Sequence, residues 1–212
     1  QTLFLSDHAH EYLILYDLMS KPFFIQLLSD VQRVRMFVNV TNIKVSIKLE
    51  RQSLDSVENK IKNSVLSYKK YNNFIVIKDF FVYTIFRSGK NNFNHVNITK
   101  IKHFSKVEEA IEKLKDLDFN INKKSLKIDN ITGSIDLEKE VQIENIIKRV
   151  SSNASFSNLK ISYNNEKFPG LFLKLKSVGT IIIFHSGKVV FVGCKTVENL
   201  ECLASLSHVL TK

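Results

Sequence analysis

Glycine and cysteine are scarce in this chain, and each scarcity removes a class of function. Its 212 residues include only 6 Gly, which form neither a GxGxxG nor a Walker pattern, so those phosphate-binding loops are excluded. The 2 Cys, Cys194 and Cys202, stand outside any metal-ligand or CxxC spacing, and we interpret them as reduced thiols. Uninterrupted apolar runs are shorter than a membrane-spanning helix requires, so we expect no membrane partner.

Side chains with catalytic chemistry are scattered. His8, His10 and Glu11 lie close together, but no further ligand completes a metal site. Neither cysteine has a catalytic base in a recognisable arrangement. We therefore expect no enzymatic activity, no catalytic residue, no metal and no small-molecule cofactor.

A surplus of positive charge is the strongest compositional signal. Lys and Arg total 31 against 21 Asp and Glu, which gives a formal net charge of +10. Basic side chains near phosphates release condensed counterions, so the surplus suits a nucleic acid. A basic chain can also owe its charge to solubility alone. The many Lys, Asn and Ile are what the codons of an AT-rich genome would produce, so charge alone leaves both interpretations open.

The spacing of hydrophobic residues divides the chain into an N-terminal extension and two segments, or successions, with a similar order of predicted strands and helices. Apolar residues at helical spacing predict an N-terminal helical extension over residues 1–33. The first succession covers 34–122, and the second covers 123–212. In the first we expect an alternating strand at 36–49, a helix from 54, strands at 74–77 and 81–86, and a helix at 107–117. In the second we expect strands at 126–134, 168–175, 180–184 and 189–193, and helices at 141–150 and 197–210.

The two successions share short sequence landmarks. The segment 86–90 matches 184–188 at an offset of 184 − 86 = 98, and Asn42-Ile43 matches Asn130-Ile131 at an offset of 130 − 42 = 88. A period near ninety is too long for a solenoid and fits a pseudo-two-fold protein. The element order predicts an α/β (α+β) fold in which two repeats form one curved antiparallel sheet. Helices would cover its convex face, and the concave face would be free to bind.

The second copy resembles the TATA-box-binding protein (TBP) family. Lys127–Ser134 is similar to the family's central strand, Phe168–Leu171 to the start of its second stirrup, and Ile183–Lys195 to its most recognisable stretch. The resemblance covers residues 36–212 and is specific in the second copy. It implies a TBP-like saddle that binds and bends double-stranded A·T-rich DNA through the minor groove.

The resemblance implies DNA-intercalating wedges, as is known for this family. The matching positions are Phe74 and Phe86 in the first copy and Phe168 and Phe184 in the second. A flat apolar side chain inserted between base pairs unstacks a step and kinks the duplex. With 16 Phe in the chain, any single one is more often part of a core, but matched positions in both copies favour wedges.

The resemblance also implies contacts inside and beside the groove. Asn42 and Asn130 match positions that donate to the adenine N3 and thymine O2 acceptors, although a local turn bond is the plainer role for an Asn. Val190 and Val192 match apolar positions on the concave face, although valines in a strand are as often buried. The phosphate-contacting positions correspond to Ser88, Lys90, Lys174, Ser186, Lys188 and Lys195, any of which can equally be a solvated surface residue.

The first copy departs from the family pattern after its Ser-Gly-Lys turn. Residues 91–97 are rich in Asn where an apolar strand is expected, with Asn94 at the threonine position and His95 at the glycine position. We therefore expect the second copy to dominate DNA binding.

Partners follow from the same resemblance. Glu166 matches the stirrup position that meets transcription factor IIB, and a IIA-like factor would meet the helix at 106–117, whose lysines alternate with glutamates. The expected setting is RNA polymerase initiation, in the nucleus or at a site of viral transcription. Two alternatives stay open: a protein-interaction module with the same fold, and the nucleic-acid recognition domain of a larger enzyme, with which a start at Gln1 is compatible.

Overall fold

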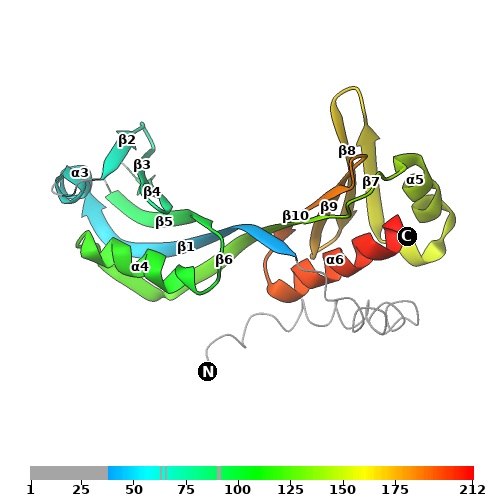
Figure 1. Ribbon diagram of the computed structural model, residues 1–212. Helices are drawn as coiled ribbons and strands as arrows, with labels where there is room; N and C mark the ends of the chain where they lie inside the picture. Colours follow the sequence, from blue (N-terminus) through cyan, green and yellow to red (C-terminus); the bar gives the residue numbers. More distant parts are fainter. Residues whose placement is uncertain (1–37, 63, 65, 90–91) are drawn as a thin grey trace. The chain divides into compact units, whose positions relative to one another are not determined.

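The computed structural model describes residues 38–62, 64, 66–89 and 92–212 (Figure 1). The predicted helical extension at 1–33 and Lys90 lie outside these residues. The described chain separates into two compact units. The N-terminal unit is Val40–Gly133 with Cys194–Thr196, and the C-terminal unit is Ser134–Gly193 with Val197–Lys212. The predicted boundary between 122 and 123 stays a prediction, because one strand passes from the first unit into the second.

Each unit repeats one order of elements, which agrees with the predicted α+β fold. The N-terminal unit holds β1 (Asn39–Ser53), α3 (Leu54–Lys62), β2 (Ser67–Lys70), β3 (Phe74–Lys78), β4 (Val82–Ser88), β5 (Asn92–Ile101), α4 (Lys106–Asp116) and most of β6 (Ile121–Asp136). The C-terminal unit holds α5 (Ile143–Ser152), the short helix η1 (Ala154–Phe156), β7 (Leu159–Asn164), β8 (Phe168–Leu175), β9 (Gly179–Phe184), β10 (Lys188–Cys194) and α6 (Val197–Thr211).

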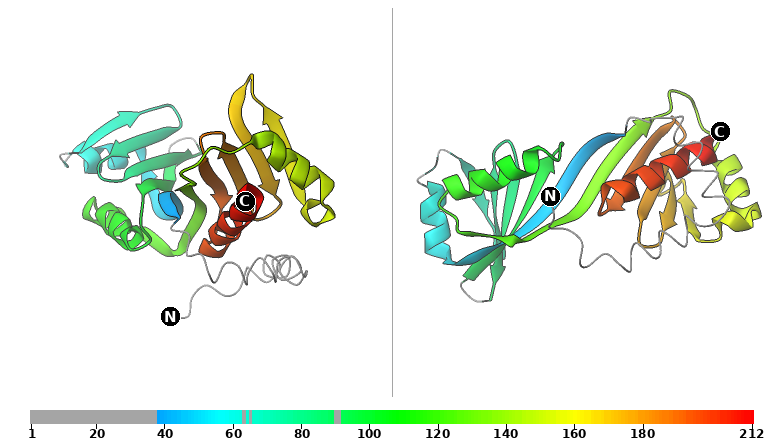
Figure 2. Two further views of the ribbon diagram at one scale, coloured as in Figure 1. Left: turned by 45° about the vertical axis from the view of Figure 1, so that its right-hand side comes forward. Right: turned by 90° about the horizontal axis from the view of Figure 1, so that it is seen from below.

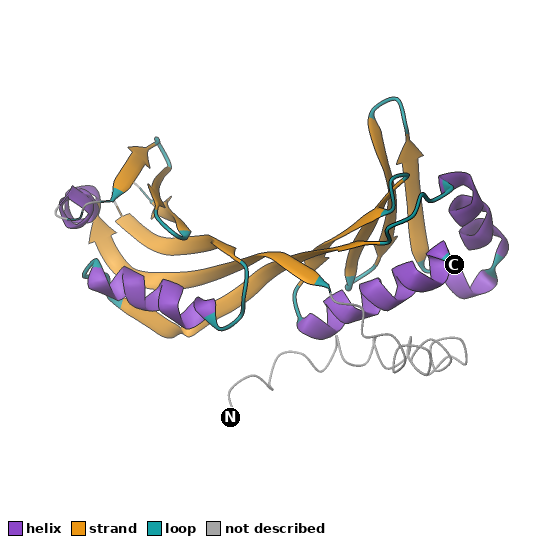
Figure 3. Cartoon of the chain, in the orientation of Figure 1, coloured by secondary structure: helices purple, strands orange, loops and turns teal. Residues whose placement is uncertain are grey.

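Hydrogen bonds order the strands as β2-β3-β4-β5-β1-β6 in the N-terminal unit and as β10-β9-β8-β7 in the C-terminal unit. In each unit a long helix lies along one face of the strands, α4 in the first and α6 in the second (Figures 2 and 3). No helix in the described part is both long and apolar enough to cross a membrane.

The helix-covered face of each unit is its core. On β1, Ile43, Val45 and Ile47 are fully buried, while Lys48 and Glu50 on the same strand are exposed. This confirms the predicted alternation, because successive side chains of a strand point to opposite faces. The helix α4 completes this core with Ala110, Ile111 and Leu114, and α6 contributes Leu200, Leu203, Ala204, Leu206 and Leu210 to the other core.

One buried polar side chain anchors α4 to the sheet of the N-terminal unit. Tyr83 on β4 is almost fully buried, and its hydroxyl donates a hydrogen bond to the Ala110 carbonyl at 3.1 Å. Burial raises the pKa of this phenol, so it stays a neutral donor. Cys194 is buried and Cys202 half-buried, and burial raises the pKa of the Cys202 thiol to about 11, so little of it is thiolate in neutral solution.

Two strands and one register differ from the sequence expectation. β2 and β7 were not predicted, because each is short or carries few apolar side chains. β5 was expected to lack an apolar face, yet its Phe93, Val96, Ile98 and Ile101 are buried. The departure in the first copy therefore affects only the other face of this strand.

The register of β5 also corrects the expected alignment. Ile85 pairs with Val96, a separation of 96 − 85 = 11, whereas Ile183 pairs with Val189, a separation of 189 − 183 = 6. The first hairpin is therefore five residues longer, and its pairing is shifted between Phe86 and Arg87. The residues that match Val190 and Val192 are consequently Asn97 and Thr99, not positions near Asn94 and His95.

The Ser-Gly-Lys turns of the two units differ in their surroundings. Gly89 and Gly187 both have positive φ angles, 74° and 87°, which favour glycine. A Cβ on Gly89 would meet nothing within 4 Å, but a Cβ on Gly187 would lie 2.1 Å from the Lys139 carbonyl oxygen. The segment around Lys139 is held against this turn by hydrogen bonds from Leu137 N–H to Gly187 O and from Val141 N–H to His185 O.

These surroundings predict different costs for one substitution. Gly89→Ala should lower the free energy of unfolding by about 1 kcal/mol, because only the positive φ is penalised. Gly187→Ala should lower it by on the order of 3 kcal/mol, because backbone must also move. Urea unfolding of both variants measures the difference. Equal losses would show that the contact with Lys139 does not constrain the turn.

Candidate nucleic-acid interface

Residues that alternate with the core of β8, β9 and β10 form an exposed side of the C-terminal unit. On β10, Val189 and Phe191 are fully buried, whereas Val190 and Val192 are half-buried on the opposite side. We call this side the C-terminal open face, and it comprises Phe172, Lys174, Thr180, Ile182, Phe184, Val190 and Val192. The two valines predicted for groove contact thus lie away from the core.

Phe168 and Phe184 meet at one end of this face, over a glycine. Gly170 lies opposite Phe184 in the β8–β9 ladder. A Cβ on Gly170 would lie 2.6 Å from Cε1 of Phe168 and 2.8 Å from Cγ2 of Ile182, so the Phe168 ring fills the space that a side chain would take. Its centroid lies 5.7 Å from that of Phe184, and Phe168 remains 40% exposed. The predicted wedges of the second copy are therefore neighbours.

The N-terminal unit places its predicted wedges differently. Phe74 lies opposite Phe86, with ring centroids 6.0 Å apart, so Phe74 has the register position of Gly170. Tyr71, in the turn before β3, stacks on Phe74 with centroids 4.6 Å apart and is 47% exposed. Tyr71 therefore has the exposure that Phe168 has in the other unit.

Sequence reasoning missed Tyr71. The Phe-to-Phe spacing selected Phe74, and a tyrosine in a polar turn carries no periodic signal. The short separation of Phe74 and Phe86, 86 − 74 = 12 against 184 − 168 = 16, was the available clue that the aromatic residues are not equivalent.

The two asparagines that are predicted to contact bases in the minor groove have different local partners. The Asn42 amide oxygen accepts a hydrogen bond from the Lys100 N–H at 2.7 Å, and Lys100 has a positive φ of 68°. Asn130 donates from Nδ2 to the Thr132 hydroxyl at 3.1 Å. The Asn42 bond uses only the amide oxygen, so the two hydrogens of its amide nitrogen are not needed for it. Donors are the groups that adenine N3 and thymine O2 require.

A carboxylate lies next to Asn130 and is neutralised locally. Asp129 accepts a hydrogen bond from the Ser46 hydroxyl at 3.0 Å, and its other oxygen lies 3.2 Å from the Lys44 amine. An unpaired carboxylate would repel phosphates, so this pairing makes the strand compatible with a polyanion.

The predicted phosphate-contacting side chains lie at the surface where they are described. Lys174 is on β8 and Lys188 begins β10, and within the described residues neither forms a salt bridge. The other exposed members of this set are Ser88, Ser186 and Lys195, while Lys90 lies outside the described residues. Lysines that are not held by carboxylates are suited to phosphate contact.

Two further predicted partner surfaces are exposed. Glu166 lies in the turn between β7 and β8. The lysines of α4 are ion-paired, as Lys106–Glu109 at 2.6 Å, Lys113–Asp79 at 2.9 Å and Lys115–Glu112 at 2.7 Å. The hydrogen bond from Lys113 lowers the pKa of the Asp79 carboxyl, so this pair stays charged in neutral solution. The α4 surface is therefore electrostatically mixed.

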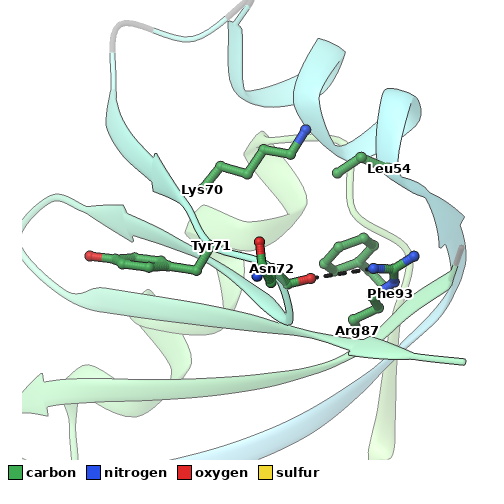
Figure 4. A pocket seen from close by; sticks show the side chains of 6 residues that line it. All are labelled: Leu54, Lys70, Tyr71, Asn72, Arg87 and Phe93. Carbon is green, nitrogen blue, oxygen red and sulfur yellow. Dashed lines mark hydrogen bonds between the residues drawn. The ribbon is translucent and has the colours of Figure 1, made fainter. Parts of the chain in front are cut away.

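A cavity of about 450 Å³ lies beside Tyr71 in the N-terminal unit (Figure 4). Its lining residues are Leu54, Lys70, Tyr71, Asn72, Arg87 and Phe93. Arg87 donates from Nη1 to the Asn72 carbonyl at 3.4 Å. The lining has two basic side chains and no carboxylate, and nowhere in the described residues does a group of His, Cys, Asp or Glu form that could hold a metal ion.

Known proteins share this arrangement. Residues 125–206 match the family model of transcription factor TFIID, or TATA-binding protein. A TATA-box-binding protein of Methanocaldococcus jannaschii is 35% identical over 123 residues, which is 55% of this chain and 60% of that protein. A TBP-related factor of Drosophila melanogaster is 33% identical over 99 residues, or 46% and 41% of the two chains.

A solved structure has the same fold. It is the Methanococcus jannaschii TBP, 28% identical, with a TM-score of 0.56 over 82% of this chain and 95% of that one. The sequence matches span less, namely 44% of a TATA-box-binding protein of Aeropyrum pernix and 60% of the Methanocaldococcus protein. The family model, these relatives and the solved structure together support a TATA-box-binding-protein-family chain, at modest sequence identity.

Proposed function

We propose that this protein binds A·T-rich promoter DNA through the minor groove, bends it, and recruits RNA polymerase initiation factors. The observation that carries the proposal is the exposed Phe168 beside Phe184, at the end of the apolar C-terminal open face. Apolar side chains inserted between base steps kink a duplex, and apolar strand residues fit a widened groove. The relatives named TATA-box-binding proteins support the same reading.

Each group of side chains has a distinct role in this proposal. Phe168 and Phe184 unstack a base step, and Val190 and Val192 cover sugars and base edges. Asn42 and Asn130 donate to A·T acceptors in the groove. The serines and lysines of the two turns, with Lys174, fix the register on the backbone through phosphate contacts.

Partner binding is proposed at two surfaces. The turn that carries Glu166 is the proposed contact for a IIB-like factor, since it is exposed next to the Phe168 wedge. The α4 helix is the proposed contact for a IIA-like factor, through its alternating charges. The proposed place of action is the nucleus or a site of viral transcription.

Affinity for DNA should depend on sequence. A short TATA duplex should bind at least about tenfold more tightly than a G·C-rich duplex of equal length, since several mismatched pairs each cost affinity. Fluorescence anisotropy over a salt series measures both affinities. Equal affinities for the two duplexes, or no binding at low salt, would contradict the proposal.

Bending should depend on the paired phenylalanines. The double variant Phe168→Ala with Phe184→Ala should lose most of the bend, because no side chain then enters the base step. Energy transfer between dyes on the duplex ends measures it. A matched control is Phe80→Ala, since Phe80 is 74% exposed but lies in the β3–β4 turn beneath Lys113 of α4. If the double variant bends DNA as the parent protein does, the wedge assignment is wrong.

The salt dependence of DNA affinity should increase with the number of phosphate contacts. Lys174→Ala should reduce the slope of log affinity against log salt by about 0.9, the value for one lost contact with duplex DNA. Lys115→Ala is the control, because Lys115 is paired with Glu112 on α4. Anisotropy titrations at several salt concentrations give both slopes. An unchanged slope for Lys174→Ala would remove Lys174 from the interface.

A further inference from the structure

The exposed side of the N-terminal unit is chemically unlike that of the C-terminal unit. We call it the N-terminal open face, and it comprises Ser46, Val76, Thr84, Phe86, His95, Asn97 and Thr99. All but the buried Ser46 are half-buried side chains that alternate with buried core residues.

Strand pairing allows a residue-by-residue comparison of the two faces. Thr84 pairs with Asn97 as Ile182 pairs with Val190. Val82 pairs with Thr99 as Thr180 pairs with Val192. In the first comparison, the apolar Ile182 and Val190 of the C-terminal open face correspond to polar residues of the N-terminal open face.

Asn97 lies between two polar residues on the neighbouring strands. Its backbone neighbours are Thr84 on β4 and Ser46 on β1. On its own strand, the Asn97 Oδ1 lies 3.1 Å from Nε2 of His95. The pair can form with a ring N–H donating to the amide oxygen, or with a flipped amide donating to the ring nitrogen. In both arrangements the Asn97 oxygen keeps a lone pair that can accept another hydrogen bond.

This acceptor matters for the identity of a base pair. In the minor groove, a G·C pair differs from an A·T pair by the guanine N2 amino group, which is a donor. An apolar side chain such as Val190 leaves that donor without a partner, and an unmade buried hydrogen bond is costly. A carbonyl oxygen at the Asn97 position can receive it.

We propose that the N-terminal open face accepts a G·C pair in its half of the DNA site, through Asn97, while the C-terminal open face requires A·T pairs. The proposal rests on the proposed function, because it names the base preference of the same minor-groove interface. The specificity of the protein is then asymmetric, although the fold repeats.

Three duplexes test the proposal. They have A·T pairs throughout, one G·C pair in one half, or one G·C pair in each half. Because the protein can bind in either orientation, the one-sided duplex places its G·C pair under the N-terminal unit. Its affinity should lie within about threefold of the A·T duplex, and that of the two-sided duplex should fall by tenfold or more, the cost of a wrong pair. A tenfold loss on the one-sided duplex would overturn the proposal.

Variants identify the residue responsible. Asn97→Val should lose about tenfold more affinity for the one-sided duplex than for the A·T duplex. Replacing guanine by inosine, which lacks the N2 amino group, should restore the affinity that Asn97→Val loses on the one-sided duplex. The reciprocal variant Val190→Asn should gain affinity for the two-sided duplex. A face that does not touch DNA would also tolerate G·C, but Asn97→Val would then change nothing, and this result would overturn the proposal.

The two hypotheses fail in different ways. Absence of binding to the A·T duplex at low salt would refute the proposed function itself. Normal binding to that duplex, with a tenfold loss on the one-sided duplex, would refute only the asymmetric preference.

Discussion

Packing of a helix against one face of each set of strands is the constraint on which the other features depend. Successive strand residues point to opposite faces, so burying Ile43, Val45 and Ile47 commits the residues between them to the other side. By the same rule, Val190 and Val192 lie on the opposite side of β10, because Val189 and Phe191 are buried in the core of the C-terminal unit. Cross-strand hydrogen bonds then align these exposed residues into rows. The candidate interface is therefore a consequence of how the core is built.

Much of this could be predicted from the sequence, because hydrophobic periodicity and the repeated Ser-Gly-Lys turn are local signals. The strands β3, β4, β8, β9 and β10 and the long helices follow from them. The register of β5 could not be predicted, since the longer first hairpin and its irregular pairing leave no periodic trace. Tyr71 was missed for a related reason: its exposure depends on how the turn before β3 folds back onto Phe74. Pairing geometry, unlike periodicity, depends on residues distant in the sequence.

The two asparagines show that equivalent positions need not have equivalent roles. The Asn42 oxygen holds the N–H of Lys100, whose positive φ is unfavourable for a residue with a side chain. Asn42 therefore supports the irregular β1–β5 pairing as well as any contact with DNA. Asn130 donates a hydrogen bond to the Thr132 hydroxyl, two residues away on the same strand. Loss of Asn42 would therefore mix a folding defect with a binding defect.

On β5, the two sides of the strand have diverged to different degrees. On β5 the core side keeps Phe93, Val96, Ile98 and Ile101 buried, while the open side carries His95, Asn97 and Thr99. Core positions are constrained by packing density, and a change of even one methylene there is costly. Half-exposed positions on the opposite face carry no such cost, so their chemistry can change without loss of the fold. A repeated fold can in this way keep two equivalent cores while its two open faces acquire different base preferences.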